Sequence, residues 1–197
     1  MSVVGRARNM LRQPTAEWAT IEGEEVEPLQ LFSGYVARVA ILPAAAGFLS
    51  MMLFSHSGVR IGFGTALGNA LAQYVSSIAM VYVIAFIADV LAAGFEGHQN
   101  MDQALKLAAY AMTPAWIAGI FVIVPGIGWL LTVLGSLYSL YVLFLGVTVL
   151  MRVPAQKAVT YAVAIAALAI AVNFMLAMIN VKLFGVGAGG IFNGVSL

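Results

Sequence analysis

The sequence contains no cysteine and few charged residues. Asp, Glu, Lys and Arg together make up 9% of its 197 residues, whereas a soluble domain has about 25%. The absence of cysteine excludes disulfides, thiolate metal sites and cysteine nucleophiles. Nine basic and eight acidic residues give a net charge of +1. Since a nucleic-acid-binding protein needs a concentrated basic face, we expect no nucleic-acid partner.

Long apolar runs take the place of charge. Hydrophobic residues account for 62% of the chain, and the mean hydropathy is +1.00. Residues 107–151 include no Asp, Glu, Lys, Arg or His, and only the turn-forming sequence PGIG at 125–128 interrupts them. A membrane helix needs about 20 apolar residues to cross a hydrocarbon layer of about 30 Å. This run therefore predicts a helical hairpin through a bilayer.

Five such runs are present, and they predict an all-α integral membrane protein, a bundle of five transmembrane helices. Each run has about the length of a spanning helix, with tilt absorbing the longer second one. The predicted spans are 32–55, 67–93, 105–124, 127–150 and 158–181. They form a membrane domain at 32–183, followed by a Gly-rich tail at 184–197. The tail lacks the preceding strand and the Lys-Ser/Thr pair of a phosphate loop.

The N-terminal segment, residues 1–31, holds much of the charge. Its apolar residues have helical spacing on both sides of Pro14, which predicts two short interfacial helices on the cytoplasmic surface of the bilayer. In this arrangement Trp18 is an aromatic residue at the membrane rim. A mobile polar tail is the alternative. We expect the segment to be retained, because no apolar stretch of a signal peptide follows its arginines.

The basic residues predict the orientation, because loops rich in Lys and Arg resist translocation. With a cytoplasmic N-terminus, six basic residues lie inside and only Arg60 and Lys182 lie outside. The six are Arg6, Arg8, Arg12, Lys106, Arg152 and Lys157. Five spans then place the C-terminus outside.

Several stretches resemble the Yip1 domain in its prokaryotic form. In the third and fourth predicted spans these are LAAYAMTPAW at 107–116, VPGIG at 124–128 and LYSLYVLFLG at 137–146. QPTAEW at 13–18 is similar to the Asn-Pro-x-x-x-Trp pattern of that family, with Gln in place of Asn. GFEG at 94–97 is similar to its Phe-Gly-Gly turn.

This resemblance implies five membrane helices and a cytoplasmic N-terminus, in a bacterial inner (plasma) membrane. Eukaryotic relatives act in vesicle traffic and bind small Rab-type GTPases or each other. The N-terminal segment here lacks the long cytoplasmic region that those relatives use, so we do not carry the trafficking role over.

Two charged residues fall in the interior of the predicted spans, Arg38 in the first and Asp89 in the second. Charges in hydrocarbon are costly and mark functional sites. We expect the two to form an intramembrane ion pair, which would neutralise both charges. Alternatively, Arg38 can extend alone to the headgroups, as cationic side chains near helix ends do.

Other polar residues have expected architectural roles. Asn69 and Asn173 are predicted to hydrogen-bond between helices. Thr113 and Pro114 predict a kink in the third span. Asn100 and Gln103 have the spacing of a helix N-cap pair.

The loop after the second span gathers three residues of types that bind metals, Glu96, His98 and Asp102. A solvated turn with a helix cap is the expected reading of this loop. A metal site is the minor alternative, because ligand geometry and outer-shell partners are needed as well.

No Ser-His-Asp set can be assembled from these residues, so we expect no enzyme activity and no cofactor. The sequence therefore favours a non-enzymatic scaffold or interaction protein that works through its cytoplasmic face. Its partners would be the lipid bilayer and other membrane proteins or a second copy. The alternative function is a small channel or transporter that uses Arg38 and Asp89, with Asn173 on its pathway.

Overall fold

A computed structural model describes residues 2–25, 27–54 and 61–184, and it gives the side chains up to residue 178. Helices form nearly all of the described chain, and the described residues include no strand. In chain order the elements are α1 (Val3–Arg12), α2 (Pro14–Glu22), α3 (Pro28–Leu31), the π-helical turn η1 (Phe32–Val36), α4 (Ala37–Leu53), α5 (Phe63–Ala92), the 3₁₀ turn η2 (Ala93–Phe95), α6 (Met101–Ala111), α7 (Thr113–Ala118), the 3₁₀ turn η3 (Gly119–Ile123), α8 (Gly128–Leu150) and α9 (Ala155–Phe184).

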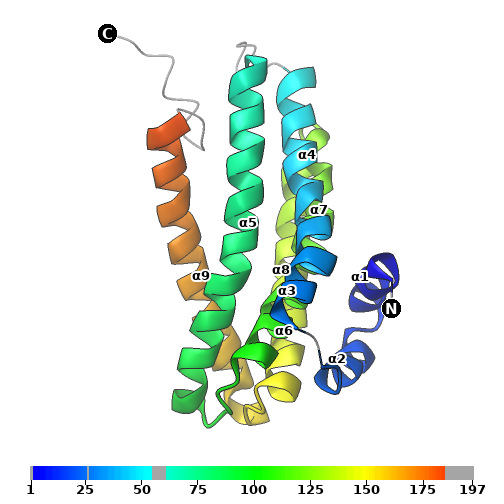
Figure 1. The fold of residues 1–197 in the computed structure, drawn as a ribbon, viewed down its shortest axis with the longest axis vertical. Helices are drawn as coiled ribbons and strands as arrows, with labels where there is room; N and C mark the ends of the chain where they lie inside the picture. Colours follow the sequence, from blue (N-terminus) through cyan, green and yellow to red (C-terminus); the bar gives the residue numbers. More distant parts are fainter. Residues whose placement is uncertain (1, 26, 55–60, 185–197) are drawn as a thin grey trace.

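Five helical stretches of the described chain are long and apolar enough to cross a membrane. They are Pro28–Leu53, Phe63–Phe95, Met101–Ile123, Gly128–Leu150 and Ala155–Met178. These stretches stand side by side as a bundle, with α1 and α2 beside it at one end (Figure 1). The predicted all-α membrane bundle of five spans is therefore confirmed. Residues 185–197 of the predicted Gly-rich tail, and Arg60, lie outside the described residues.

The third span is interrupted where the sequence predicted a kink. α6 ends at Ala111 and α7 begins at Thr113, with Pro114 in its first turn. Proline cannot donate a backbone hydrogen bond, which explains a break at this point. The amide of Ala115 donates instead to the hydroxyl of Ser139 on α8, at 2.9 Å. A side chain of the next span thus satisfies a donor near the break.

Two helices are longer than the hydrocarbon layer of a bilayer is thick. α5 and α9 have 30 residues each, or about 45 Å at 1.5 Å per residue, against a hydrocarbon layer of about 30 Å. Part of the bundle must therefore project beyond the hydrocarbon. We refer below to the end of the bundle that carries α1 and α2 as the N-terminal end (Figure 1).

Two connections are packed together at the N-terminal end. The backbone N–H of His98, between η2 and α6, donates to the carbonyl of Met151, between α8 and α9, at 2.8 Å. A Cβ atom on Gly97 would lie 2.7 Å from the Val153 side chain, so only glycine fits there without a shift. Asn100 caps α6 by accepting a hydrogen bond from the amide of Gln103, as its spacing predicted.

Candidate functional site

Helix α2 is fixed to the bundle by a buried tryptophan. The side chain of Trp18 is fully buried, and its indole N–H donates to the backbone carbonyl of Val142 on α8 at 3.0 Å. Gly146, one turn further along α8, provides the space, because a Cβ atom there would lie 2.8 Å from the ring. Trp18 is therefore part of the protein core, and its level relative to the membrane rim stays a prediction.

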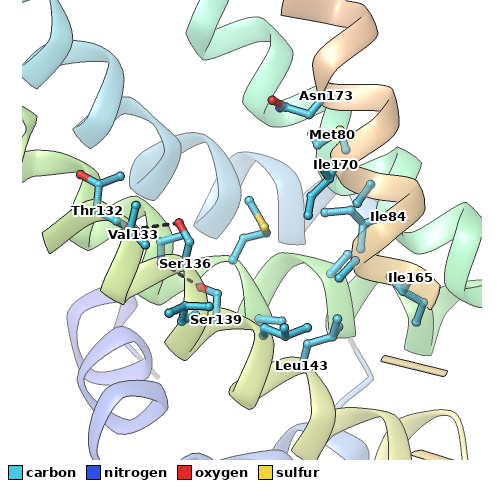
Figure 2. A pocket seen from close by; sticks show the side chains of 18 residues that line it. Met80, Ile84, Thr132, Val133, Ser136, Ser139, Leu143, Ile165, Ile170 and Asn173 are labelled. Carbon is cyan, nitrogen blue, oxygen red and sulfur yellow. Dashed lines mark hydrogen bonds between the residues drawn. The ribbon is translucent and has the colours of Figure 1, made fainter. Parts of the chain in front are cut away.

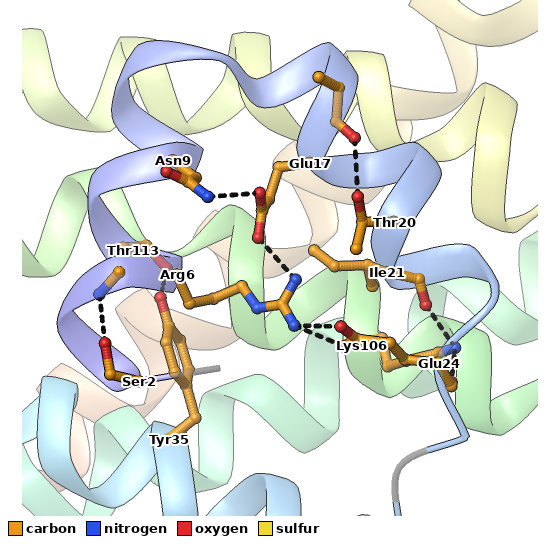
Figure 3. Close-up of polar contacts among 12 residues, drawn as sticks. Ser2, Arg6, Asn9, Glu17, Thr20, Ile21, Glu24, Tyr35, Lys106 and Thr113 are labelled. Atoms are coloured by element: carbon orange, nitrogen blue, oxygen red, sulfur yellow. Dashed lines mark hydrogen bonds and ion pairs between the residues drawn. The ribbon is translucent and has the colours of Figure 1, made fainter.

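An arginine is buried between α1 and α2. The Arg6 guanidinium contacts Glu17 at 2.6 Å and Glu24 at 2.5 Å, and Asn9 donates to the second oxygen of Glu17 at 2.9 Å. The side chains of Arg6 and Glu17 are each only 6% exposed. Figure 3 shows Arg6 pointing between the two carboxylates, from α1 toward α2 and its C-terminal extension. These buried charges are satisfied by one another, as buried charges must be.

Burial by itself would lower the pKa of Arg6, but its hydrogen bond to Glu24 and the nearby negative charges raise the pKa above the ordinary value. A raised pKa means that the guanidinium keeps its charge, and the stability it contributes, throughout the physiological pH range. The guanidinium also lies 5.4 Å from the ring centre of Tyr110 on α6, within the range of a cation–π contact. Arg6 therefore stays charged, and the network that it forms with Glu17 and Glu24 extends to Tyr110 in the bundle.

A lysine from the third span holds the end of α2. Lys106 is buried on α6, and its Nζ donates to the backbone carbonyls of Ile21 at 3.0 Å and Glu24 at 2.9 Å. The last carbonyls of a helix lack intrahelical partners, and a cation there also opposes the negative end of the helix dipole. Lys106 was predicted only as one of the inside-facing basic residues, since its sequence position gives no sign of this contact.

Exposed charged side chains cover the outer side of α1 and α2. Arg8 and Arg12 on α1 and Glu25 and Glu27 after α2 are all exposed. Two ion pairs with exposed partners occur nearby, between Arg152 and Glu22 at 3.6 Å and between Lys157 and Glu96 at 2.7 Å. Side chains of both signs are thus available for contact at the N-terminal end.

Arg38 and Asp89 are not brought together. Arg38 is exposed on α4, and the ion pairs among the described residues do not include one with Asp89. The two residues lie at different positions along the bundle. The carbonyl of Ala37 accepts a hydrogen bond from Tyr74 of α5 at 3.2 Å, and Tyr74 lies 15 residues, or about 22 Å, along α5 from Asp89.

Asp89 lies close to the end of α5, three residues before Ala92. Its Oδ1 atom is buried and has no hydrogen-bond partner among the described residues, while its backbone carbonyl accepts a hydrogen bond from Gln99 at 3.2 Å. α5 is longer than the hydrocarbon layer is thick, and Asp89 lies near the end of α5 that leads into η2. The exposed side chain of Arg38 is compatible with the alternative of extending alone to the headgroups.

The other predicted polar residues have diverse contacts. Asn69 on α5 donates to the sulfur of Met51 on α4 at 3.5 Å, an interhelical contact. The buried hydroxyl of Thr113 shares a hydrogen bond of 2.7 Å with Tyr35 of the first span. Asn173 is exposed on α9 and has no hydrogen bond to another described residue.

The possible metal ligands do not converge. Among the described residues, no three His, Cys, Asp or Glu side chains are arranged to hold a metal ion. Glu96 is paired with Lys157, while His98 and Asp102 are exposed. Glu96 also ends its turn in the left-handed conformation, with φ of 60°. The structure therefore supports a solvated turn. Glu96, His98 and Asp102 do not form the metal site that was the minor alternative.

A cavity of about 470 Å³ lies between α5, α6, α7, α8 and α9. Figure 2 shows Thr132, Ser136 and Leu143 of α8 facing Asn173, Ile170 and Ile165 of α9 across it. Its lining is apolar apart from three hydroxyl groups and one carboxamide, and it includes no ionisable residue.

Comparison with known protein families now identifies the chain. The model of the Yip1 domain matches residues 8–177, which extend from the middle of α1 through the last span. The chain belongs to the Yip1 domain family. No curated protein and no solved structure matches the chain.

The match to the Yip1 domain covers both the attachment of α2 to the bundle and the cavity between the spans. The match includes Trp18, Lys106 and Gly146, which join α2 to the bundle, and the helices that enclose the cavity. Arg6 lies two residues before it. This Yip1 domain is therefore an integral membrane protein whose N-terminal helices are part of the folded bundle.

Proposed function

We propose that this Yip1 domain protein is a non-enzymatic scaffold that binds other proteins, or a second copy of itself, through the charged face at its N-terminal end. We infer that this face is cytoplasmic and that the protein resides in a bacterial inner membrane. The observation that carries the proposal is the rigid attachment of α1 and α2. Buried Trp18, the Arg6 network and Lys106 hold these helices in place, so that Arg8 and Arg12 are presented at defined positions.

A surface formed by helices that are already ordered is well suited to binding a partner. A helix pair that is already ordered loses little conformational entropy when a partner binds. Charges of both signs on its rim provide orientation and specificity more than raw affinity. A freely moving polar tail would lack this property, which is why the attachment of α1 and α2 favours a docking role.

The channel or transporter alternative has weaker support. Neither Arg38 nor Asp89 lines the cavity between the spans, and its lining residues include no ionisable group. An ion pathway through hydrocarbon requires polar or charged side chains along its length. Catalysis would likewise need a nucleophile and a base within hydrogen-bond reach, and the cavity offers only hydroxyl groups and a carboxamide.

Partner retention tests the scaffold. The full-length protein is crosslinked in native membranes, purified and analysed by quantitative mass spectrometry. We expect a set of membrane proteins, or dimers of the chain, that is lost in Arg8→Glu/Arg12→Glu and kept in Arg8→Lys/Arg12→Lys. Both variants should unfold at the wild-type temperature, because these side chains are exposed.

A flux assay tests the channel or transporter alternative. Vesicles containing the purified protein should pass protons and metal ions no faster than empty vesicles do. Saturable flux that Asp89→Asn abolishes would overturn the scaffold and favour the transporter.

A further inference from the structure

The cavity runs along α8 and α9. On α8 its lining extends from Thr132 to Leu143, a rise of eleven residue steps or about 16 Å of helix. The cavity has a volume of about 470 Å³, and an extended acyl chain can lie along a groove of this length.

The cavity opens toward the surrounding lipid. Leu137 on α8 is 59% exposed and Ile170 on α9 is 69% exposed, and both line it. Its inner wall is closed by buried side chains, among them Met80 of α5 and Ile165 of α9. In Figure 1, α9 leans away from the bundle toward its C-terminal end. A groove that is closed inside and open to the bilayer admits an occupant from the membrane.

Small side chains create the space. Five alanines line the cavity, Ala108, Ala111, Ala115, Ala166 and Ala169. Alanines on one helix face normally permit close helix packing, but here Ala166 and Ala169 face a void. Empty space beside hydrocarbon forfeits the dispersion contacts of its walls, so an apolar chain gains contacts by entering.

One end of the cavity is polar. Asn173 points its carboxamide into the space (Figure 2) and has no hydrogen bond to another described residue. By contrast, the hydroxyls of Thr132 and Ser136 donate to backbone carbonyls of α8 at 3.0 and 2.9 Å, and that of Ser139 accepts from Ala115. Asn173 is thus the lining residue whose polar group is available to an occupant, within the described part of the chain.

The depth of this polar end is set by a nearby tryptophan. Trp129, at the start of α8, is 66% exposed, and exposed tryptophan concentrates at the membrane–water interface. Thr132 follows it by three residues, or about 4.5 Å. The cavity then extends about 16 Å inward, close to the thickness of one leaflet, which is half of about 30 Å.

We propose that the cavity is a phospholipid site, in which one acyl chain lies along α8 and α9 and its ester group accepts a hydrogen bond from Asn173. The lipid comes from the leaflet at the Trp129 end. Because lipid surroundings provide no hydrophobic driving force, the site gains its selectivity from close packing and from this hydrogen bond. The inference does not depend on the proposed scaffold function.

Photocrosslinking of the full-length protein tests the site. The protein is placed in vesicles of phosphatidylethanolamine and phosphatidylglycerol that contain phosphatidylethanolamine with a diazirine midway along one acyl chain. After irradiation, mass spectrometry locates the adducts. We expect adducts at Leu137, Leu140 and Ile170 to exceed those at Leu134 and Phe174, which are exposed but do not line the cavity.

Variants separate this site from general lipid contact. Ala169→Phe fills the cavity and should lower the cavity adducts about tenfold, the change that about 1.4 kcal/mol produces. Ala167→Phe, the same substitution on an exposed face of α9 outside the cavity, should leave them unchanged. Asn173→Leu should lower them about threefold, as expected for an intramembrane hydrogen bond of about 0.6 kcal/mol.

Three results would overturn the proposal. One is an adduct distribution that does not distinguish the cavity from the outer faces of α8 and α9. Another is a distribution that both Ala169→Phe and Asn173→Leu leave unchanged. The third is a crosslink between two copies of the chain through a photoreactive amino acid placed at Ile170, which would place a second copy there. Should Ala169→Phe not fold, as judged by size-exclusion chromatography and circular dichroism, the wild-type distribution and Asn173→Leu decide the question.

Discussion

At the residue scale, Gly146 determines how closely α2 approaches the bundle. A Cβ atom at this position would lie 2.5 Å from Leu107 and 2.8 Å from the Trp18 ring. We therefore expect Gly146→Ala to lower the free energy of unfolding by about 1–3 kcal/mol, the usual cost of overpacking. Thermal unfolding in detergent measures the effect.

Gly64 is the matched control for this prediction. It is also helical, on α5, but a Cβ atom there would meet nothing within 4 Å. Gly64→Ala should leave the unfolding temperature unchanged or raise it, because alanine is a better helix former. Equal destabilisation by both substitutions would mean that Gly146 does not serve the packing of Trp18.

Arg6 gives a second prediction at this scale. Replacing it with methionine leaves the Glu17 carboxylate buried without a cation, and removal of one partner of a buried pair costs about 3–5 kcal/mol. Arg8→Met, on the exposed side of the same helix, should change stability by less than about 0.5 kcal/mol. Denaturant unfolding of both variants in the same detergent makes the comparison.

A double substitution shows whether the loss comes from the stranded charge. Arg6→Met combined with Glu17→Leu removes both buried charges, and apolar replacement of a buried ion pair is often neutral or stabilising. We expect the double variant to be more stable than Arg6→Met alone. A double variant that is less stable would show that Arg6 acts mainly through Tyr110 or Glu24.

The sequence could predict those residues whose roles follow from neighbours in the chain. Asn100 is a helix cap because its partner is three residues away, and Pro114 breaks a helix by itself. Trp18 and Arg6 could not be placed in this way. Trp18 bonds to Val142, 124 residues later, and an amphipathic pattern alone assigns a tryptophan to a membrane surface as readily as to a groove in another helix.

At the element scale, α2 depends on Lys106 for its C-terminal end. Lys106→Met removes the donor for the carbonyls of Ile21 and Glu24, and we expect faster amide exchange throughout α2 with little change in α8. Hydrogen exchange with mass spectrometry measures this difference. The reason is that unsatisfied terminal carbonyls must turn toward water, which opens the last turn.

Lys157→Met is the control for Lys106→Met. Its ammonium pairs with Glu96, but both side chains are largely exposed, and such a pair contributes about 0–1 kcal/mol. Its loss should leave the exchange of α2 at the wild-type rate. If Lys106→Met also leaves α2 unchanged, the lysine does not hold that helix.

Helix lengths show the limit of prediction at this scale. Apolar runs identified all five spans, because about 20 uncharged residues have few other uses. The same runs placed Asp89 inside the membrane, since tilt was assumed to absorb the long second span. In the structure, α5 extends through Ala92 with 30 residues, and Asp89 lies three residues before its end. Composition locates a helix but does not determine which part of it the bilayer covers.

At the scale of the whole molecule, the charges and the packing indicate the same asymmetry. α1, α2 and the connections around His98 and Arg152 share one end of the bundle (Figure 1). That end also contains the Arg6 network and both exposed ion pairs. A surface with so many charges is costly to move across a bilayer.

This asymmetry leads to a prediction about topology. Six of the nine basic residues lie toward the N-terminal end, and loops rich in Lys and Arg remain in the cytoplasm. We expect a reporter inserted at Gln99 to be active in the cytoplasm and one fused after Leu197 to be active outside it. Alkaline phosphatase and a fluorescent protein, which work on opposite sides of a bacterial inner membrane, read the two positions independently. Reporters that place both positions on the same side would contradict the five crossings, whereas exchanged sides would leave the bundle intact and invert it. In the inverted case the charged face of α1 and α2 would meet extracytoplasmic partners, and the lipid site near Trp129 would open to the cytoplasmic leaflet.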